Sequence, residues 1–195
     1  MSTLNFYMNL LSYKPHLQNL MQGLLYPAML GTFIVLYISN YFFTESNVEL
    51  LIRLDFLYSI LLIFYFCLSY LVNESIKKYN IYNAITFLAD LLEIFLMYKL
   101  FSIIDIENSS TFASNIRNFY WFALFVPAIQ IIWNISLGEK TLIYYMLNGI
   151  SIFLFLVSYQ WGFKYEIYNY MLCLFIFSII LFYMLILLKD EEFSD

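Results

Sequence analysis

Apolar residues gather in six long runs along the chain, each about twenty residues long with few or no charges. The runs cover residues 18–43, 50–72, 81–104, 119–137, 142–163 and 167–188. A helix needs about 20 apolar residues to cross the ~30 Å hydrocarbon core of a bilayer, where its backbone hydrogen bonds must be made internally. Short polar segments separate the runs. The pattern predicts an all-α integral membrane bundle of about six transmembrane helices, in a single transmembrane domain covering residues 1–195.

The composition supports a lipid environment. Of the 195 residues, 63% are hydrophobic and only 12% are charged, whereas a soluble domain carries roughly 25% charged residues. A chain of this length could not cover its outside with so few polar groups, so we expect the lipid bilayer to be its main partner. The net charge of -5 argues against a nucleic-acid partner, because phosphate binding needs clustered Lys and Arg.

The loops indicate the orientation in the membrane. With the N-terminus in the cytoplasm, the inner side holds Lys14, Lys77, Lys78, Lys140 and Lys189, and the outer side holds Arg117 and Lys164. Because cytoplasmic loops carry an excess of positive charge, we expect both ends to be cytoplasmic in a multi-pass protein of a bacterial inner membrane. Aromatic residues near the predicted span ends are expected to anchor the helices at the interfaces. They are Tyr41, Tyr120, Trp121, Trp133, Trp161 and Tyr168.

Charges inside the predicted spans are costly and need a partner or a purpose. Asp55 enters the second span from the outside and lies roughly 8 Å below the outer boundary. Lys99, near the outer end of the third span, reaches a similar depth, so we predict a structural ion pair between Asp55 and Lys99. Arg53 is shallower and is expected to reach Glu49 or the headgroups.

Two acidic residues, Asp90 and Glu93, lie near the middle of the third predicted span. Three residues apart, they share one helical face. In a layer of low dielectric constant they are expected to lose their charge or to face water or a cation. The amides of Gln130 in the fourth span and Asn148 in the fifth lie at nearby depths. The polar layer Asp90, Glu93, Gln130 and Asn148 is therefore the candidate site.

Two hypotheses for this layer remain open. In the first, its groups hydrogen-bond across helices and hold the bundle together, at about 0.6 to 2 kcal/mol each. In the second, the layer accepts a proton or attracts a cation in the wall of a pore or cavity.

The sequence offers no catalytic or cofactor site. His16 is the only histidine, and neither G-x-S-x-G nor H-E-x-x-H occurs, so the usual nucleophile and zinc motifs are missing. Cys67 and Cys173 each sit alone in an apolar run, and we interpret both as small buried hydrophobic residues. We therefore predict a protein that is not an enzyme and has neither metal nor cofactor.

The remaining function classes are a membrane subunit and a transporter. Alternating access usually shows as Gly and Pro inside the spans and as two similar halves. This chain has five Gly and three Pro and no repeat, and only the stretch around Pro27, from Gly23 to Gly31, suggests a kink. We predict a non-enzymatic sensor, anchor or pore subunit that works as a homo-oligomer or with a cytoplasmic partner. A small secondary transporter for a cation or small solute is the alternative.

The make-up of the chain adds a resemblance. Ile, Asn, Tyr, Phe and Lys are abundant relative to Ala, Gly, Arg and Pro, and almost no aqueous domain is present. In size and composition the chain resembles the small multi-pass membrane subunits of bacterial phage-defence operons. The resemblance implies a role in antiviral defence and assigns no residue.

Overall fold

The computed structural model describes residues 18–44, 53–75, 84–104, 109–138, 142–161 and 166–192. All the secondary structure in these ranges is helical, which confirms the all-α prediction. A π-helical turn, η1 (Met21–Leu25), leads directly into α2 (Tyr26–Thr44). The other helices are α4 (Leu54–Ser75), α5 (Ala84–Ile103), α6 (Ser109–Ala123), α7 (Phe125–Leu137), α8 (Leu142–Trp161) and α9 (Glu166–Glu192).

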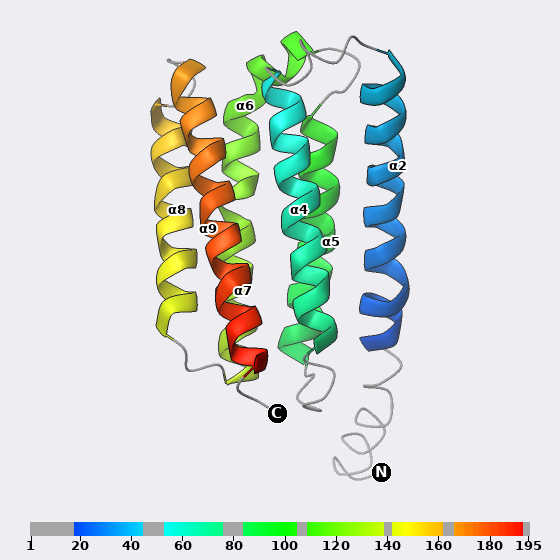
Figure 1. Ribbon diagram of the computed structural model, residues 1–195, viewed down its shortest axis with the longest axis vertical. Coiled ribbons are helices and arrows are strands. Elements are labelled where there is room, and N and C mark those ends of the chain that lie inside the picture. Colours follow the sequence, from blue (N-terminus) through cyan, green and yellow to red (C-terminus); the bar gives the residue numbers. More distant parts are fainter. Residues whose placement is uncertain are drawn as a thin grey trace, which may run out of the picture.

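Five helical rods close a ring, and a sixth lies outside it (Figure 1). In the ring, α4 packs on α9, α9 on α8, α8 on α6 and α7, and these two on α5, which contacts α4. Helices α6 and α7 stack end to end and form one rod. The sixth rod, η1 with α2, packs against α4 and α5. The described chain begins, and α9 ends, at the same end of the bundle.

Four helical segments are long and apolar enough to cross a membrane, as judged by length and composition. They are Gln18–Ser39, Ser114–Ser136, Leu142–Trp161 and Ile167–Leu185. The apolar part of α4, Leu54–Tyr70, is shorter, and α5 carries three charged residues. The four long segments indicate a helical membrane protein.

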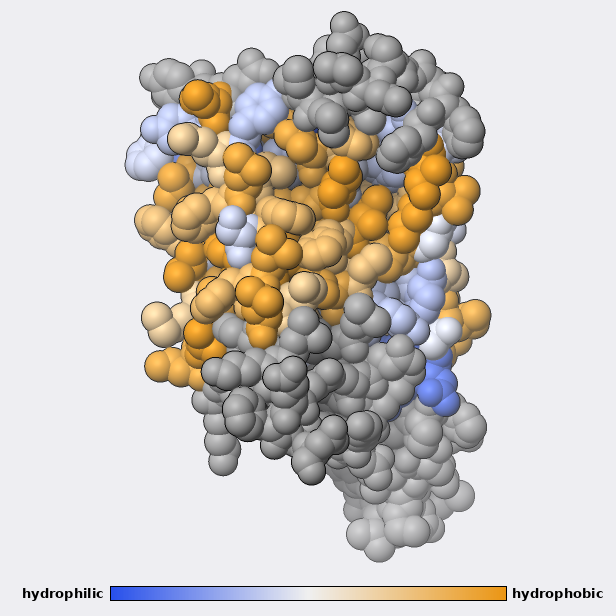
Figure 2. Space-filling view, viewed as in Figure 1, coloured by the Kyte–Doolittle hydropathy of each residue, from blue (hydrophilic) through white to orange (hydrophobic). Residues whose placement is uncertain are grey.

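The outer face of the bundle is apolar, as a lipid-facing surface requires. Figure 2 shows apolar side chains over the middle of the visible face. Large hydrophobic residues point outward on several helices, among them Val35, Leu142, Phe153, Ile167 and Leu174, each more than 60% exposed. Soluble proteins of this size rarely expose so many large apolar side chains.

The fourth rod is longer than the predicted span 119–137, because helix α6 already begins at Ser109. Its buried residues recur every three or four positions, as in a helix with one apolar face. They are Phe112, Ile116, Phe119, Tyr120 and Ala123. The polar residues between them lower the average hydropathy of the segment, so a prediction based on apolar runs misses its first ten residues.

Proline and glycine explain the irregular points of the helices. Pro127 lacks an N–H and cannot bond to the carbonyl of Ala123, and the rod breaks there between α6 and α7. Gly138 ends α7 with a φ of 74°, and its amide bonds to the carbonyls of Asn134 and Ile135. The irregularity expected around Pro27 takes the form of the π-helical turn η1, which directly precedes Tyr26.

Candidate functional site

The two central carboxyl groups lie on the buried face of α5. Asp90 is 2% exposed and Glu93 is 4% exposed. The other buried residues of this helix recur at the same three- and four-residue spacing, and they are Thr86, Ala89, Leu96, Met97, Leu100 and Phe101. The carboxyl groups therefore belong to the stripe that α5 turns toward its neighbours, away from lipid.

Side chains from neighbouring helices donate hydrogen bonds to both carboxyl groups. Gln22 Nε2 donates to Asp90 Oδ2 at 3.3 Å, and Trp133 Nε1 donates to Asp90 Oδ1 at 3.2 Å. Ser69 Oγ donates to Glu93 Oε1 at 2.6 Å, and the Tyr26 hydroxyl lies 3.3 Å from the same oxygen. These donors come from η1, α2, α4 and α7. The acidic pair thus connects α5 to three other rods at one depth.

The contact between α5 and the first rod depends on matched spacing. Gln22 and Tyr26 are four residues apart, and the carboxyl groups that they contact are three residues apart. Gln22 lies within the π-helical turn η1 and Tyr26 directly follows it, and π-helical geometry occurs frequently at functional sites. The Tyr26 hydroxyl also lies 3.2 Å from the Phe66 carbonyl of α4. Its single proton is therefore shared between α4 and α5.

The two amides predicted for the polar layer do not hydrogen-bond to the carboxyl groups. Gln130 Nε2 donates to Asn134 Oδ1 at 3.4 Å, and Asn148 Nδ2 donates to the Tyr144 carbonyl one turn back, at 2.9 Å. A bond to the carbonyl four residues earlier satisfies an amide within its own helix. Similar depth therefore did not imply a bond across helices.

The tyrosines and tryptophans explain why the carboxyl partners were missed. Trp133, Tyr120 and Tyr41 were predicted at the interfaces, but all three are buried. Trp121, Trp161 and Tyr168 are exposed, as anchors should be. Buried Tyr and Trp usually find a hydrogen-bond partner for their polar atom. Asking which partner Trp133 could find would have pointed to Asp90.

The predicted ion pair between Asp55 and Lys99 is wrong, because Asp55 pairs with Arg53. Arg53 Nη2 lies 2.7 Å from Asp55 Oδ2, and Nε lies 3.2 Å from Oδ1. The Tyr41 hydroxyl donates to the same carboxyl group at 2.9 Å. Arg53 precedes the start of α4, so its side chain can fold back onto a residue only two positions later. Glu49, the predicted partner of Arg53, lies outside the described residues.

Lys99 finds a different environment. Its Nζ lies 5.8 Å from the ring centre of Phe95 and 6.0 Å from that of Tyr98. Cation–π contacts of this kind contribute about 0.5–1 kcal/mol at exposed sites. Lys99 therefore lies against aromatic rings of its own helix.

A second buried polar cluster joins α4, α6 and α9. The hydroxyls of Tyr58 and Tyr120 are 2.9 Å apart, and Tyr120 lies 2.7 Å from Asn169 Oδ1. The Tyr58 hydroxyl also lies 3.0 Å from the Asn169 carbonyl oxygen. Each phenol has one proton, so only two of the three contacts can be hydrogen bonds at a time. The sequence analysis did not identify this cluster.

Within the part of the chain that the structure describes, no three His, Cys, Asp or Glu side chains gather in a way that could hold a metal ion. Cys173 is buried and Cys67 is half-buried, and neither is bonded to another cysteine. The chain matches no protein-family model, and no similar curated protein or solved structure is found.

Proposed function

We propose that this chain is a six-span protein of a bacterial inner membrane, with both ends in the cytoplasm. It acts as a non-enzymatic membrane subunit of an oligomer or a multi-protein assembly. The six helical rods and their apolar outer faces support this topology. Rods α4 and α5 belong to the same ring as the long apolar helices, which supports a similar depth for them. The first rod begins and the last rod ends at the same end of the bundle, as expected for an even number of crossings.

The proposed role is that of a sensor whose input is the protonation of Asp90 and Glu93. One observation carries this proposal: two carboxyl groups buried side by side accept hydrogen bonds from three other rods. Hydrogen bonds to an ionised carboxylate are roughly twice as strong as those between neutral groups. A proton that arrives or leaves therefore changes the bonding of several helices together.

The first rod is the element that such a change would move. It packs outside the ring, against α4 and α5, and polar contacts hold it near both ends. Near its start, Gln22 and Tyr26 contact the acidic pair. Near its other end, Tyr41 donates to Asp55, which Arg53 neutralises. Only the first of these two attachments involves the acidic pair of α5. Protonation is therefore expected to shift the start of the rod and to leave its far end in place.

Distance measurements between spin labels test this proposal. Leu24 on η1 and Leu92 on α5 are both exposed, and they lie close in sequence to the acidic contacts. Labels at these two positions, in a variant without Cys67 and Cys173, are measured in nanodiscs by double electron–electron resonance. We expect the distance distribution to change between about pH 5 and about pH 8, the range over which such a sensor would act.

Two controls make the measurement specific. Labels at the exposed residues Ser39 and Ser102 report on the far half of the same two helices and should show a constant distance. The double substitution Asp90→Asn with Glu93→Gln keeps oxygen acceptors but removes the titrating protons, and it should abolish the change at the first pair. If the distance between labels at Leu24 and Leu92 does not change with pH in the unsubstituted chain, the proposed sensor is contradicted.

A sensor and a pore differ in ion flux. Liposomes with a trapped pH dye are placed in a more acidic buffer. If the acidic pair lined a proton path, the interior of liposomes that contain the chain would acidify faster than that of empty liposomes, which hold the dye but no protein. With a sensor alone, the dye signal stays at the level of empty liposomes while the label distance still responds to pH. Flux that survives the Asp90→Asn, Glu93→Gln double substitution would place any conduction path elsewhere.

A further inference from the structure

The ring of helices forms a partly open cavity of about 90 Å³. Its wall includes residues of α4, α5, α6, α7, α8 and α9, but none of α2. Most of the lining is aliphatic or aromatic carbon, from residues such as Leu61, Ala123, Leu147, Phe155 and Ile176. In a measure where one water takes roughly 10–15 Å³, several waters would fit, yet apolar cavities tend to stay dry and to bind apolar molecules.

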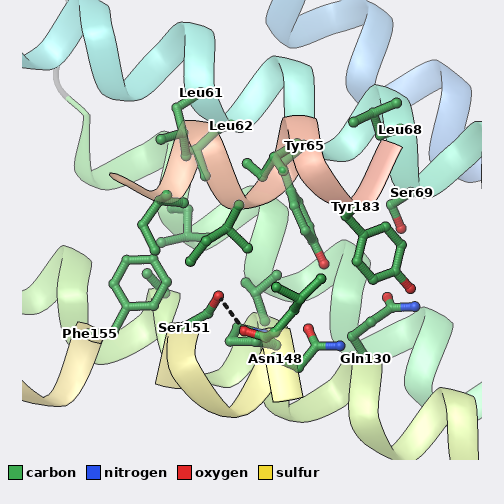
Figure 3. A pocket seen from close by; sticks show the side chains of 18 of the residues that line it. Leu61, Leu62, Tyr65, Leu68, Ser69, Gln130, Asn148, Ser151, Phe155 and Tyr183 are labelled. Atoms are coloured by element: carbon green, nitrogen blue, oxygen red, sulfur yellow. Dashed lines mark hydrogen bonds between the residues drawn. The ribbon is translucent and has the colours of Figure 1, made fainter. Parts of the chain in front are cut away.

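Most polar side chains of the cavity lie toward one end, whereas Ser151 lies nearer the other. Figure 3 shows Tyr65, Ser69, Gln130 and Tyr183 at that end, with Leu61 and Phe155 toward the other. Tyr65 is half-buried and lines the cavity, so its phenol hydroxyl can hydrogen-bond to a bound molecule. Asn148 also lines the cavity. Amides and hydroxyls can both donate and accept, so this end suits a polar group of either kind.

The chemistry of the wall limits the ligand. None of the residues that line the cavity is charged, and a charged group would be costly to bring into an apolar space. Phe119 and Phe155 also line the cavity, and their rings contact Tyr120 of the second polar cluster. A ligand therefore meets carbon along most of its length and neutral polar groups at one end, the usual design of a small-molecule site.

We propose that this cavity binds an uncharged amphiphile with a single short hydrocarbon chain and a hydroxyl or carbonyl head. The chain lies against the apolar wall, and the head hydrogen-bonds to Tyr65 and Gln130. A molecule of this chemistry can come from the bilayer or from outside the cell. This inference does not rest on the proposed proton sensor, since it needs only the cavity and its lining.

Photolabelling with a diazirine analogue of 1-octanol, a molecule of about the volume of the cavity, tests the proposal on the full chain in nanodiscs. Mass spectrometry of peptides should find label on residues 61–69 of α4 and 176–183 of α9, which contribute to the wall. Ala123→Phe fills the cavity and should lower this labelling at least ten-fold. Ala28→Phe adds the same ring at an exposed position of α2 and should leave the labelling unchanged.

A second pair of measurements tests the polar end. Tyr65→Phe and Gln130→Leu should each weaken labelling by the alcohol about two- to ten-fold, as expected for one lost hydrogen bond. A diazirine alkane without a head should label both variants as it labels the unsubstituted chain. If the alkane competes as well as the alcohol and the polar substitutions change neither, the assignment of the head is overturned.

Competition on the unsubstituted chain gives a test that does not depend on whether the variants fold. Excess unlabelled 1-octanol should remove label from the cavity segments but not from lipid-facing positions such as Leu174. Label found only on the outer surface, with no competition, overturns the whole proposal. Mass spectrometry of the complex as extracted from cells separates the two sources. A bilayer amphiphile co-purifies, whereas a ligand from outside the cell must be added.

Discussion

Glu93→Leu removes the buried carboxyl group of α5 and keeps a side chain of similar reach. This substitution distinguishes a carboxyl group that stabilises the bundle from one whose role is to bind and release a proton. Glu93 accepts hydrogen bonds from Ser69 and Tyr26, and both donors have another carbonyl available. The Tyr26 hydroxyl already lies near the Phe66 carbonyl. A serine inside a helix can bond to the carbonyl four residues earlier, which for Ser69 belongs to Tyr65.

The opposing contributions to stability are similar in size. Hydrogen bonds between side chains in membrane proteins contribute about 0.6 kcal/mol on average and up to ~1.7, so losing two of them costs roughly 1–3 kcal/mol. Burying a polar group costs about 1–3 kcal/mol by mutational measures, and a charged group costs more. Because both donors find other acceptors, we expect Glu93→Leu to leave the free energy of unfolding within about 1 kcal/mol of its original value or to raise it.

Reversible unfolding in mixed micelles with increasing dodecyl sulfate measures this free energy. Asp55→Leu is the control, since it also replaces a buried carboxyl with leucine. It leaves the Arg53 guanidinium without its carboxylate and Tyr41 without its acceptor, so it should cost about 2–3 kcal/mol. If Glu93→Leu costs as much as Asp55→Leu, the carboxyl group of Glu93 belongs to the bonding of the bundle, and the argument for a sensor fails.

Further substitutions test the fold with the same unfolding measurement. Tyr120→Phe removes the donor of the Asn169 side-chain oxygen and should cost about 1–2 kcal/mol. The exposed Tyr98→Phe should change stability by less than about 0.5 kcal/mol, and equal effects would contradict the second polar cluster. Gly138→Ala, at a φ of 74°, should cost about 1 kcal/mol. Gly149→Ala, with open space around a helical glycine, should gain roughly 0.5–1 kcal/mol. Effects of the same sign would contradict that contrast.

Most of the helices could be predicted from apolar runs alone. The predicted spans 18–43 and 142–163 agree within two residues with the helices that end at Thr44 and Trp161. The first ten residues of α6 were missed because an apolar run reflects the average polarity of a segment, whereas a helix needs only one apolar face. Phe112 and Ile116 provide that face between polar neighbours. The periodicity of buried positions was therefore the stronger signal there.

The candidate site could be predicted only in part. Asp90 and Glu93 stand out in the sequence because acidic residues are rare at that depth in a span. Their partners depend on how each helix is rotated about its axis, and depth does not determine rotation. Gln130 and Asn148 lie at a suitable depth but hydrogen-bond within their own helices. Asp55 is a second example, because it pairs with Arg53, which lies just before the start of the same helix, and not with a residue of similar depth on another helix.

The contact between Trp133 and Asp90 gives the protein a built-in optical reporter. Of the three tryptophans in the chain, Trp121 and Trp161 face outward, and only Trp133 is buried with its indole N–H on a carboxyl group. Exchanging the two outer indoles for phenylalanine would leave one tryptophan, whose emission wavelength depends on the charge beside it. The purified chain could then be followed in nanodiscs by its own fluorescence, without any attached dye.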